Sequence, residues 1–135
     1  MQFKRLNLLL ALMMVSGLAS AQDAEDQSVP ASTNIPGQPY PRVHPDGRAT
    51  FRIRAPEAQS VFLDMGGRHA MQKDEEGFWT ITTGPLDLGF HYYSLVVDGV
   101  MFSDPASESF YGTGKMSSAI EIPSPDEDFY KPHPD

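Results

Sequence analysis

Short runs of alternating apolar and polar residues, separated by turn residues, make up most of the chain after residue 38. Arg48 to Arg54 (RATFRIR) is the clearest of them. Its alanine, phenylalanine and isoleucine fall on one face of an extended chain, and its arginines and threonine fall on the other. No window shows sustained helical spacing. This pattern predicts half-buried β-strands and an absence of long helices.

The strands that we expect number eight, and they are bounded by Pro, Gly and Asp. In chain order they are Tyr40 to His44, Arg48 to Arg54, Ser60 to Met65, Arg68 to Lys73, Phe78 to Thr83, Phe90 to Val97, Val100 to Ser103 and Ala119 to Ile122. Asp98-Gly99 is the strongest hairpin signal, because both central positions of a type I′ turn need positive φ. The set predicts an all-β, immunoglobulin-like antiparallel β-sandwich in a single domain.

The two faces of the longest predicted strand can be assigned by counting back from the Asp98-Gly99 turn. Tyr93 shares a face with Leu95 and Val97, and we expect this face to lie in the core. Tyr92 belongs to the outward face. Trp79 is the largest side chain available to fill the core of a sandwich, so we expect it to be buried.

The N-terminus has the three features of a signal peptide. Lys4 and Arg5 give a positive start, Leu8 to Val15 is an apolar run, and Ala19-Ser20-Ala21 supplies small residues at the cleavage site. The apolar run is roughly half of the ~20 residues that span a bilayer. We therefore expect residues 1–21 to be removed after Ala21, and the protein to be exported to the periplasm or outside the cell with no membrane association.

The rest of the chain divides into three parts by composition. Residues 22–38 are polar, acidic and rich in Ser and Pro, which predicts a flexible leader. Residues 39–123 carry the predicted domain. Residues 124–135 form an acidic, Pro-rich linker or tail, and its apolar residues are Phe129 and Tyr130.

The charge and the cysteine count exclude several classes of function. The chain carries a net charge of −8, which becomes two units more negative without Lys4 and Arg5. Because a nucleic-acid partner requires a basic surface that displaces counterions, we expect no nucleic-acid binding. The chain has no cysteine, so disulfides and thiol chemistry are excluded.

No recognised catalytic motif occurs in the sequence, whether a nucleophile elbow, a zinc-protease helix or a phosphate-binding loop. The four histidines lack metal-ligand spacing and are His44, His69, His91 and His133. Asp104 and Glu108 could form a carboxylate pair, but the Asp104-Pro105 step is typical of a turn. We therefore predict a chain that is not an enzyme and has no cofactor and no metal site.

Aromatic side chains are the feature that could carry a binding function. Pyranose rings present apolar C–H edges that stack on aromatic faces, and their hydroxyls remain free for polar partners. Tyr92 lies on the predicted outward face, and Phe110 and Tyr111 lie in a predicted loop. These three residues are our candidates for carbohydrate binding.

Several motifs, taken together and in order, resemble one known family. They are Pro41 to Arg48 (PRVHPDGR), Phe51 to Ala58 (FRIRAPEA), Gly77 to Trp79 (GFW), Gly89 to Gly99 (GFHYYSLVVDG), Asp104 to Ala106 (DPA) and Phe110 to Gly112 (FYG). This order resembles the early-set, immunoglobulin-like domain that precedes bacterial feruloyl and acetyl-xylan esterases. That domain is related to the family 48 carbohydrate-binding modules. The resemblance covers roughly residues 39–130.

The chain departs from the glycogen-binding members of the related modules. Ser94 stands where they carry a lysine, and Met101 stands where they carry a tryptophan. The resemblance therefore implies the fold and the esterase setting rather than starch or glycogen recognition. It also implies that an α/β-hydrolase domain normally follows the tail.

Two readings of function remain open. In the first, the chain is a non-catalytic accessory domain of an exported polysaccharide-degrading esterase, with weak binding of xylan-type glycans through Tyr92, Phe110 and Tyr111. In the second, it is a structural or interaction domain that packs against an esterase catalytic domain and binds no sugar. A third reading, an esterase in its own right, is disfavoured by the missing motifs.

Overall fold

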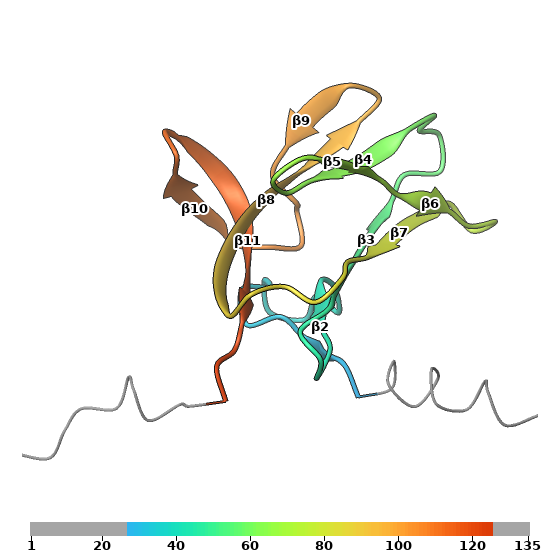
Figure 1. Cartoon of the computed structure of the whole chain (residues 1–135). Coiled ribbons are helices and arrows are strands. Elements are labelled where there is room, and N and C mark those ends of the chain that lie inside the picture. The colour runs from blue at the N-terminus through green and yellow to red at the C-terminus, as the bar shows by residue number, and fades with distance from the viewer. Residues whose placement is uncertain (1–26, 126–135) are drawn as a thin grey trace, which may run out of the picture.

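Two antiparallel β-sheets face each other in the computed structural model, which describes residues 27–125 (Figure 1). The described residues form eleven strands and no helix, so none of them builds a helix able to cross a bilayer. The all-β sandwich that the sequence predicted is confirmed. The predicted signal peptide, the first residues of the leader and most of the tail lie outside the described residues.

The first sheet has the strand order β1-β2-β3-β7-β6. Its strands are β1 (Val29–Pro30), β2 (Arg42–Val43), β3 (Ala49–Arg54), β7 (Phe78–Thr82) and β6 (Gln72–Lys73). The second sheet has the order β10-β11-β8-β4-β5, and one further strand, β9, also pairs with β8. Its strands are β10 (Ser109–Gly112), β11 (Lys115–Ile122), β8 (Gly89–Val97), β4 (Val61–Asp64), β5 (Arg68–Ala70) and β9 (Val100–Phe102).

The core lies between the sheets and is built from the alternating apolar residues of both. Phe51 of β3 is fully buried and meets Tyr93 of β8 edge to face, with ring centroids 4.7 Å apart. Trp79 is 8% exposed, and its Nε1 donates a hydrogen bond of 2.9 Å to the carbonyl oxygen of Ala55. The predictions that Tyr93 and Trp79 belong to the core are confirmed.

The hairpin between β8 and β9 has the predicted turn. Asp98 and Gly99 have φ values of 48° and 86°, as a type I′ turn requires. The Asp98 carboxylate also accepts hydrogen bonds from the backbone N–H groups of Gln59 and Ser60, at 2.8 and 2.9 Å. The turn is therefore anchored to the segment that leads into β4.

The segment expected to be a single strand from Arg68 to Lys73 is divided between the two sheets. β5 pairs with β4, whereas β6 pairs with β7 of the other sheet. Met71 lies between them and is 4% exposed. The buried Met71 side chain anchors the segment where it passes from one sheet to the other, although most of its neighbours are polar.

Two further segments differ from the sequence-based expectation. Residues 28–38, assigned to a flexible leader, pack on the sandwich: Ala31 N–H donates to Pro41 O, and Ile35 N–H donates to Ala106 O, both at 2.9 Å. Backbone hydrogen bonds hold this segment on the sandwich, and its low content of apolar residues therefore did not indicate that it is ordered. The predicted loop at residues 110–112 is strand β10, which pairs with β11 through a tight turn at Thr113-Gly114.

Candidate functional site

Three aromatic side chains cluster on the outer face of the second sheet, and we call them the aromatic surface: Phe90 and Tyr92 of β8, and Phe110 of β10. The centroid of the Phe90 ring lies 5.2 Å from that of Tyr92 and 5.0 Å from that of Phe110, with both pairs edge to face. Phe90 is 44% exposed and Tyr92 is 38% exposed. Edge-to-face packing holds the rings together while part of each remains open to solvent.

Small residues on the neighbouring strand bring the three rings together. β11 lies between β8 and β10, and its residues Ser117 and Ala119 pair with Phe110 and Tyr92, respectively. Both are almost completely buried. Because they project so little above the sheet, rings from the two flanking strands can meet across β11.

A cleft opens beside the aromatic surface because β4 is shorter than β8. β4 ends at Asp64, opposite Ser94, so residues 90–92 of β8 pair with β11 and have no strand on their other side. The resulting cavity has a volume of about 530 Å³, and Phe90 and Tyr92 form part of its wall. It is a concave, partly apolar site of the kind that suits a small ligand.

The polar groups of this cleft include two histidines, a threonine hydroxyl and backbone groups. His69 and His91 both line it. His91 Nε2 lies 2.7 Å from the carbonyl oxygen of Asp87, so this ring nitrogen is engaged within the fold as a donor. Thr83 Oγ1 donates to Gly84 O at 2.6 Å. The wall of the cleft therefore offers hydrogen-bonding groups. Among the described residues that line it, no nucleophilic side chain is hydrogen-bonded to a basic one.

The structure brings two of the three predicted binding residues together. Tyr92 and Phe110 share one face and are joined through Phe90, which sequence reasoning missed. The signal was available, because Phe90 stands two residues before Tyr92 and so shares its face. Tyr111 lies on the opposite face of β10, is 75% exposed and is paired with Met116. It is therefore separate from the aromatic surface.

Asp104, the residue considered for a carboxylate pair, is enclosed in the fold. It is 3% exposed, and its carboxylate accepts hydrogen bonds from Tyr93 Oη and Ala106 N, both at 2.9 Å. Burial raises the pKa of the Asp104 carboxyl, although the two hydrogen bonds oppose this. Burial and the nearby Asp104 raise the pKa of Tyr93 far above its usual range. This arrangement fixes the turn at Asp104-Pro105 and presents no carboxylate to a substrate.

No cluster of three or more metal-ligating side chains occurs within residues 27–125. The acidic and histidine side chains of this part of the chain are therefore dispersed. The aromatic surface and its cleft remain the arrangement best suited to a ligand, by stacking and hydrogen bonding.

Comparison with known proteins identifies a sequence relative of high identity. No protein-family profile matches the chain. An endo-1,4-beta-xylanase/feruloyl esterase of Xylanibacter ruminicola is 46% identical over 111 residues, which cover 78% of this chain and 15% of that enzyme. This chain is thus similar to a small part of a much larger enzyme.

Matches to solved structures likewise cover a small part of each matched chain. A pullulanase of Anoxybacillus sp. LM18-11, complexed with maltotetraose, has a TM-score of 0.50 and 19% identity, over 78% of this chain and 17% of the pullulanase. A putative alpha amylase of Salmonella typhimurium has a TM-score of 0.46 and 26% identity, over 59% of this chain and 14% of that chain. The pullulanase likeness concerns the fold, the immunoglobulin-like sandwich that the sequence predicted.

Proposed function

We propose that this chain is a non-catalytic accessory domain of an exported polysaccharide-degrading esterase, and that it binds xylan-type glycans weakly through the aromatic surface. Its 46% identity to a small part of a xylanase/feruloyl esterase supports the setting. The observation that carries the binding function is the partly exposed cluster of Phe90, Tyr92 and Phe110. The export rests on the N-terminal sequence pattern.

The geometry suits a sugar chain better than a small apolar ligand. Partly exposed rings at the lip of a cleft provide apolar faces for pyranose C–H groups, and the cleft supplies polar partners such as His69 for the hydroxyls. Binding is expected to be weak, because more than half of the surface of Phe90 and of Tyr92 is buried against the protein and cannot contact a ligand.

Affinity electrophoresis of the full chain through gels that contain arabinoxylan, glucuronoxylan or glycogen tests this function. We expect retardation in the xylan gels. In the arabinoxylan gel, Tyr92→Ala and Phe110→Ala should each abolish it, whereas Val100→Ala, which truncates an apolar side chain that is 65% exposed on β9, should not. Unchanged retardation of both aromatic variants would overturn the assignment of this surface.

Tyr111 provides a separate arm of the same experiment. We propose it as a third stacking residue that a glycan reaches by passing over the edge of β10, since its ring lies on the other face of that strand. Tyr111→Ala should therefore weaken the retardation by long xylan chains and leave the binding of short oligosaccharides unchanged.

A second candidate function is an interaction domain that packs against a catalytic hydrolase domain and binds no sugar. It is favoured by an apolar hollow of about 570 Å³ where the described chain begins and ends, lined in part by Val29, Leu88, Ile122 and Pro123. Val29 and Leu88 are 58% and 60% exposed. Titration of the chain with the catalytic domain of the related esterase tests it, and Leu88→Asp should abolish such binding without altering glycan retardation.

A further inference from the structure

Another hollow lies on the opposite side of the sandwich from the aromatic surface. It is a groove of about 440 Å³ on the outer face of the first sheet, and we call it the arginine groove. Two arginines, a histidine, a tyrosine, three threonines and a serine line it, and none of the described residues that line it is acidic. The whole chain carries a net charge of −8, so this local composition is the reverse of the average.

The outward-facing residues of β3 and β7 form the floor of the groove. Thr50 and Arg52 alternate with the buried Phe51, and they pair with Thr82 and Thr80 of β7. Alternation thus places hydroxyl and guanidinium groups on one face of two adjacent strands.

Arg52 is held in place by aromatic rings and retains hydrogen-bonding capacity. Its guanidinium carbon lies 4.0 Å from the centroid of the Phe78 ring and 5.6 Å from that of Tyr40. Its Nε is buried and has no hydrogen-bond partner among the described residues. Arg52 Nη2 forms an ion pair with Asp74 Oδ2 at 3.6 Å, which is beyond ordinary hydrogen-bond length. Arg52 is therefore a positioned cation with an unpaired donor.

Arg42 adds a second fixed positive charge. Its Nε donates a hydrogen bond to Ser28 Oγ at 2.8 Å, and its terminal nitrogens donate to the carbonyl oxygens of Ser28 and Pro39. These partners are all uncharged, and Arg42 forms no ion pair with any described carboxylate. Its charge is thus held at the groove, and no carboxylate within residues 27–125 forms an ion pair with it.

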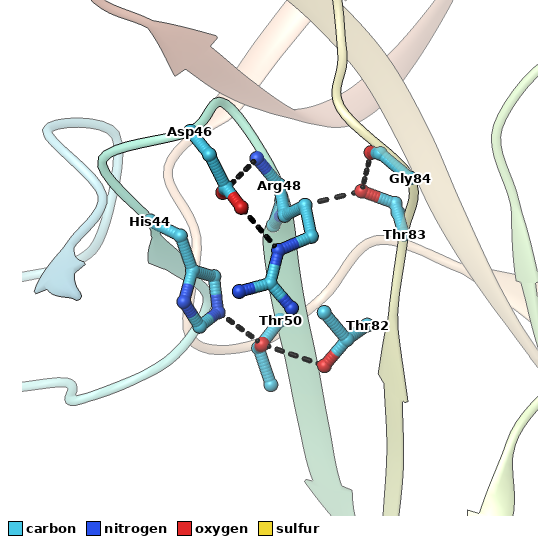
Figure 2. Close-up of polar contacts among 8 residues, drawn as sticks. His44, Asp46, Arg48, Thr50, Thr82, Thr83 and Gly84 are labelled. Atoms are coloured by element: carbon cyan, nitrogen blue, oxygen red, sulfur yellow. Dashed lines mark hydrogen bonds and ion pairs between the residues drawn. The ribbon is translucent and has the colours of Figure 1, made fainter. Parts of the chain in front are cut away.

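A hydrogen-bonded row of polar side chains lies beside these cations. His44 Nε2 is 2.7 Å from Thr50 Oγ1, which is 2.8 Å from Thr82 Oγ1, and Figure 2 shows the three side chains in sequence. Hydroxyl groups of this kind both donate and accept, and so they match the hydroxyls of a sugar.

We propose that the arginine groove is a second ligand site, which takes a carboxylate-bearing sugar unit (a uronic acid) of a saccharide. The planar fork of an arginine suits a carboxylate, the hydroxyl row suits sugar hydroxyls, and Tyr40 supplies an aromatic wall. The acidic remainder of the protein repels extended polyanions, so a saccharide that carries isolated carboxylates fits better than a nucleic acid. This site does not depend on glycan binding by the aromatic surface.

Titration of the isotope-labelled full chain, followed through its amide NMR signals, tests the proposal. The probes are a neutral xylo-oligosaccharide, one of equal length with a single glucuronate side group, and acetate. We expect the acidic oligosaccharide alone to shift the signals of Thr80 and Thr82. Its affinity should fall several-fold between about 0.03 and 0.3 M salt, because the Debye length shortens. Equal shifts with the neutral sugar, or with acetate, would overturn the proposal.

Substitutions in the groove provide the second part of the test. Arg52→Gln should weaken binding of the acidic oligosaccharide about tenfold, and Arg52→Lys should weaken it less but measurably, because lysine keeps the charge and loses the fork. Arg54→Gln removes an exposed charge from the same strand outside the groove, and should leave the affinity unchanged. Thr80→Val provides a further groove variant if Arg52→Gln does not fold.

These outcomes are independent of the aromatic surface. Tyr92→Ala should abolish retardation by neutral xylan and leave the Thr80 and Thr82 shifts intact. Folded Arg52→Gln and Thr80→Val variants with wild-type affinity for the acidic oligosaccharide would show that the groove is not its site.

Discussion

The ring of Tyr92 lies so close to Gly112 that any side chain at that position would have to displace the ring. A β-carbon on Gly112 would stand 2.3 Å from Tyr92 Cζ and 2.4 Å from its hydroxyl oxygen. Real β-carbons do not approach other atoms this closely. The glycine at the end of β10 therefore leaves the space that the Tyr92 ring occupies in the aromatic surface.

Substitution of this glycine should disturb the surface without breaking the core. We expect Gly112→Ala to displace the Tyr92 ring and to lower the free energy of unfolding by about 1 kcal/mol, as overpacking of a partly mobile side chain does. Urea unfolding measures the stability, and gel retardation by xylan measures the loss of binding that should accompany it.

Gly84→Ala is the matched control for this substitution. A β-carbon on Gly84 meets no atom within 4 Å, and its φ lies outside the left-handed region. Its unfolding free energy should stay within about 0.5 kcal/mol of the unsubstituted chain. If Gly112→Ala changes the free energy of unfolding as little as Gly84→Ala does, the Tyr92 ring does not need the space that glycine leaves.

Asp98 contributes to stability in two ways that can be separated. It adopts a φ of 48° and accepts two backbone hydrogen bonds, from Gln59 and Ser60. Asp98→Ala loses both bonds and places alanine in the left-handed region, so the free energy of unfolding should fall by about 2–4 kcal/mol. Asp98→Asn keeps a carbonyl oxygen and tolerates this φ, and it should cost about 1 kcal/mol or less. Equal losses in the two variants, measured by urea unfolding, would contradict this account.

Removing the hydrogen bond of Trp79 should lower the free energy of unfolding less than removing most of its side-chain volume. Trp79→Phe removes the 2.9 Å bond to Ala55 O and leaves a small void, so we expect a loss of about 2–3 kcal/mol in thermal or urea unfolding. Trp79→Ala should cost about 3–5 kcal/mol. Glycan retardation of the folded Phe variant should be unchanged, because the tryptophan lies in the core and not on the aromatic surface.

Much of the fold was predictable because local rules and tertiary packing agree along most of the chain. The alternation of apolar and polar residues predicted which side chains of β3 and β8 face the core, and the Asp98-Gly99 pair predicted the hairpin between β8 and β9. At these places, each residue's own preference and its burial favour the same structure.

The failures come where the stabilising contacts are distant in sequence. Residues 28–38 are poor in apolar side chains, and they are held by backbone bonds to Pro41 and Ala106 that no local pattern records. β10 was missed because its turn, Thr113-Gly114, is not among the strongest hairpin signals. The arginine groove could not be foreseen either, since strand pairing brings Arg42 of β2 beside β3.

Asp104 gives the domain a pH dependence whose sign can be worked out. Burial raises the pKa of this carboxyl above its ordinary value of 3.8, so the folded protein holds the proton more tightly than the unfolded chain. The free energy of unfolding should therefore fall as the pH rises from about the ordinary value through the raised pKa, and this contribution should be constant at higher pH.

Asp104→Asn isolates this contribution from that of the other carboxyls. The amide keeps an oxygen for Ala106 N–H and offers an N–H to Tyr93 Oη, so the geometry of the turn is preserved. The unfolding free energy of the wild type minus that of the variant, measured in urea, should increase as the pH is lowered from about 7 towards 4. A difference that decreases over this range would mean that the hydrogen bonds from Tyr93 and Ala106 stabilise the ionised carboxylate by more than burial destabilises it.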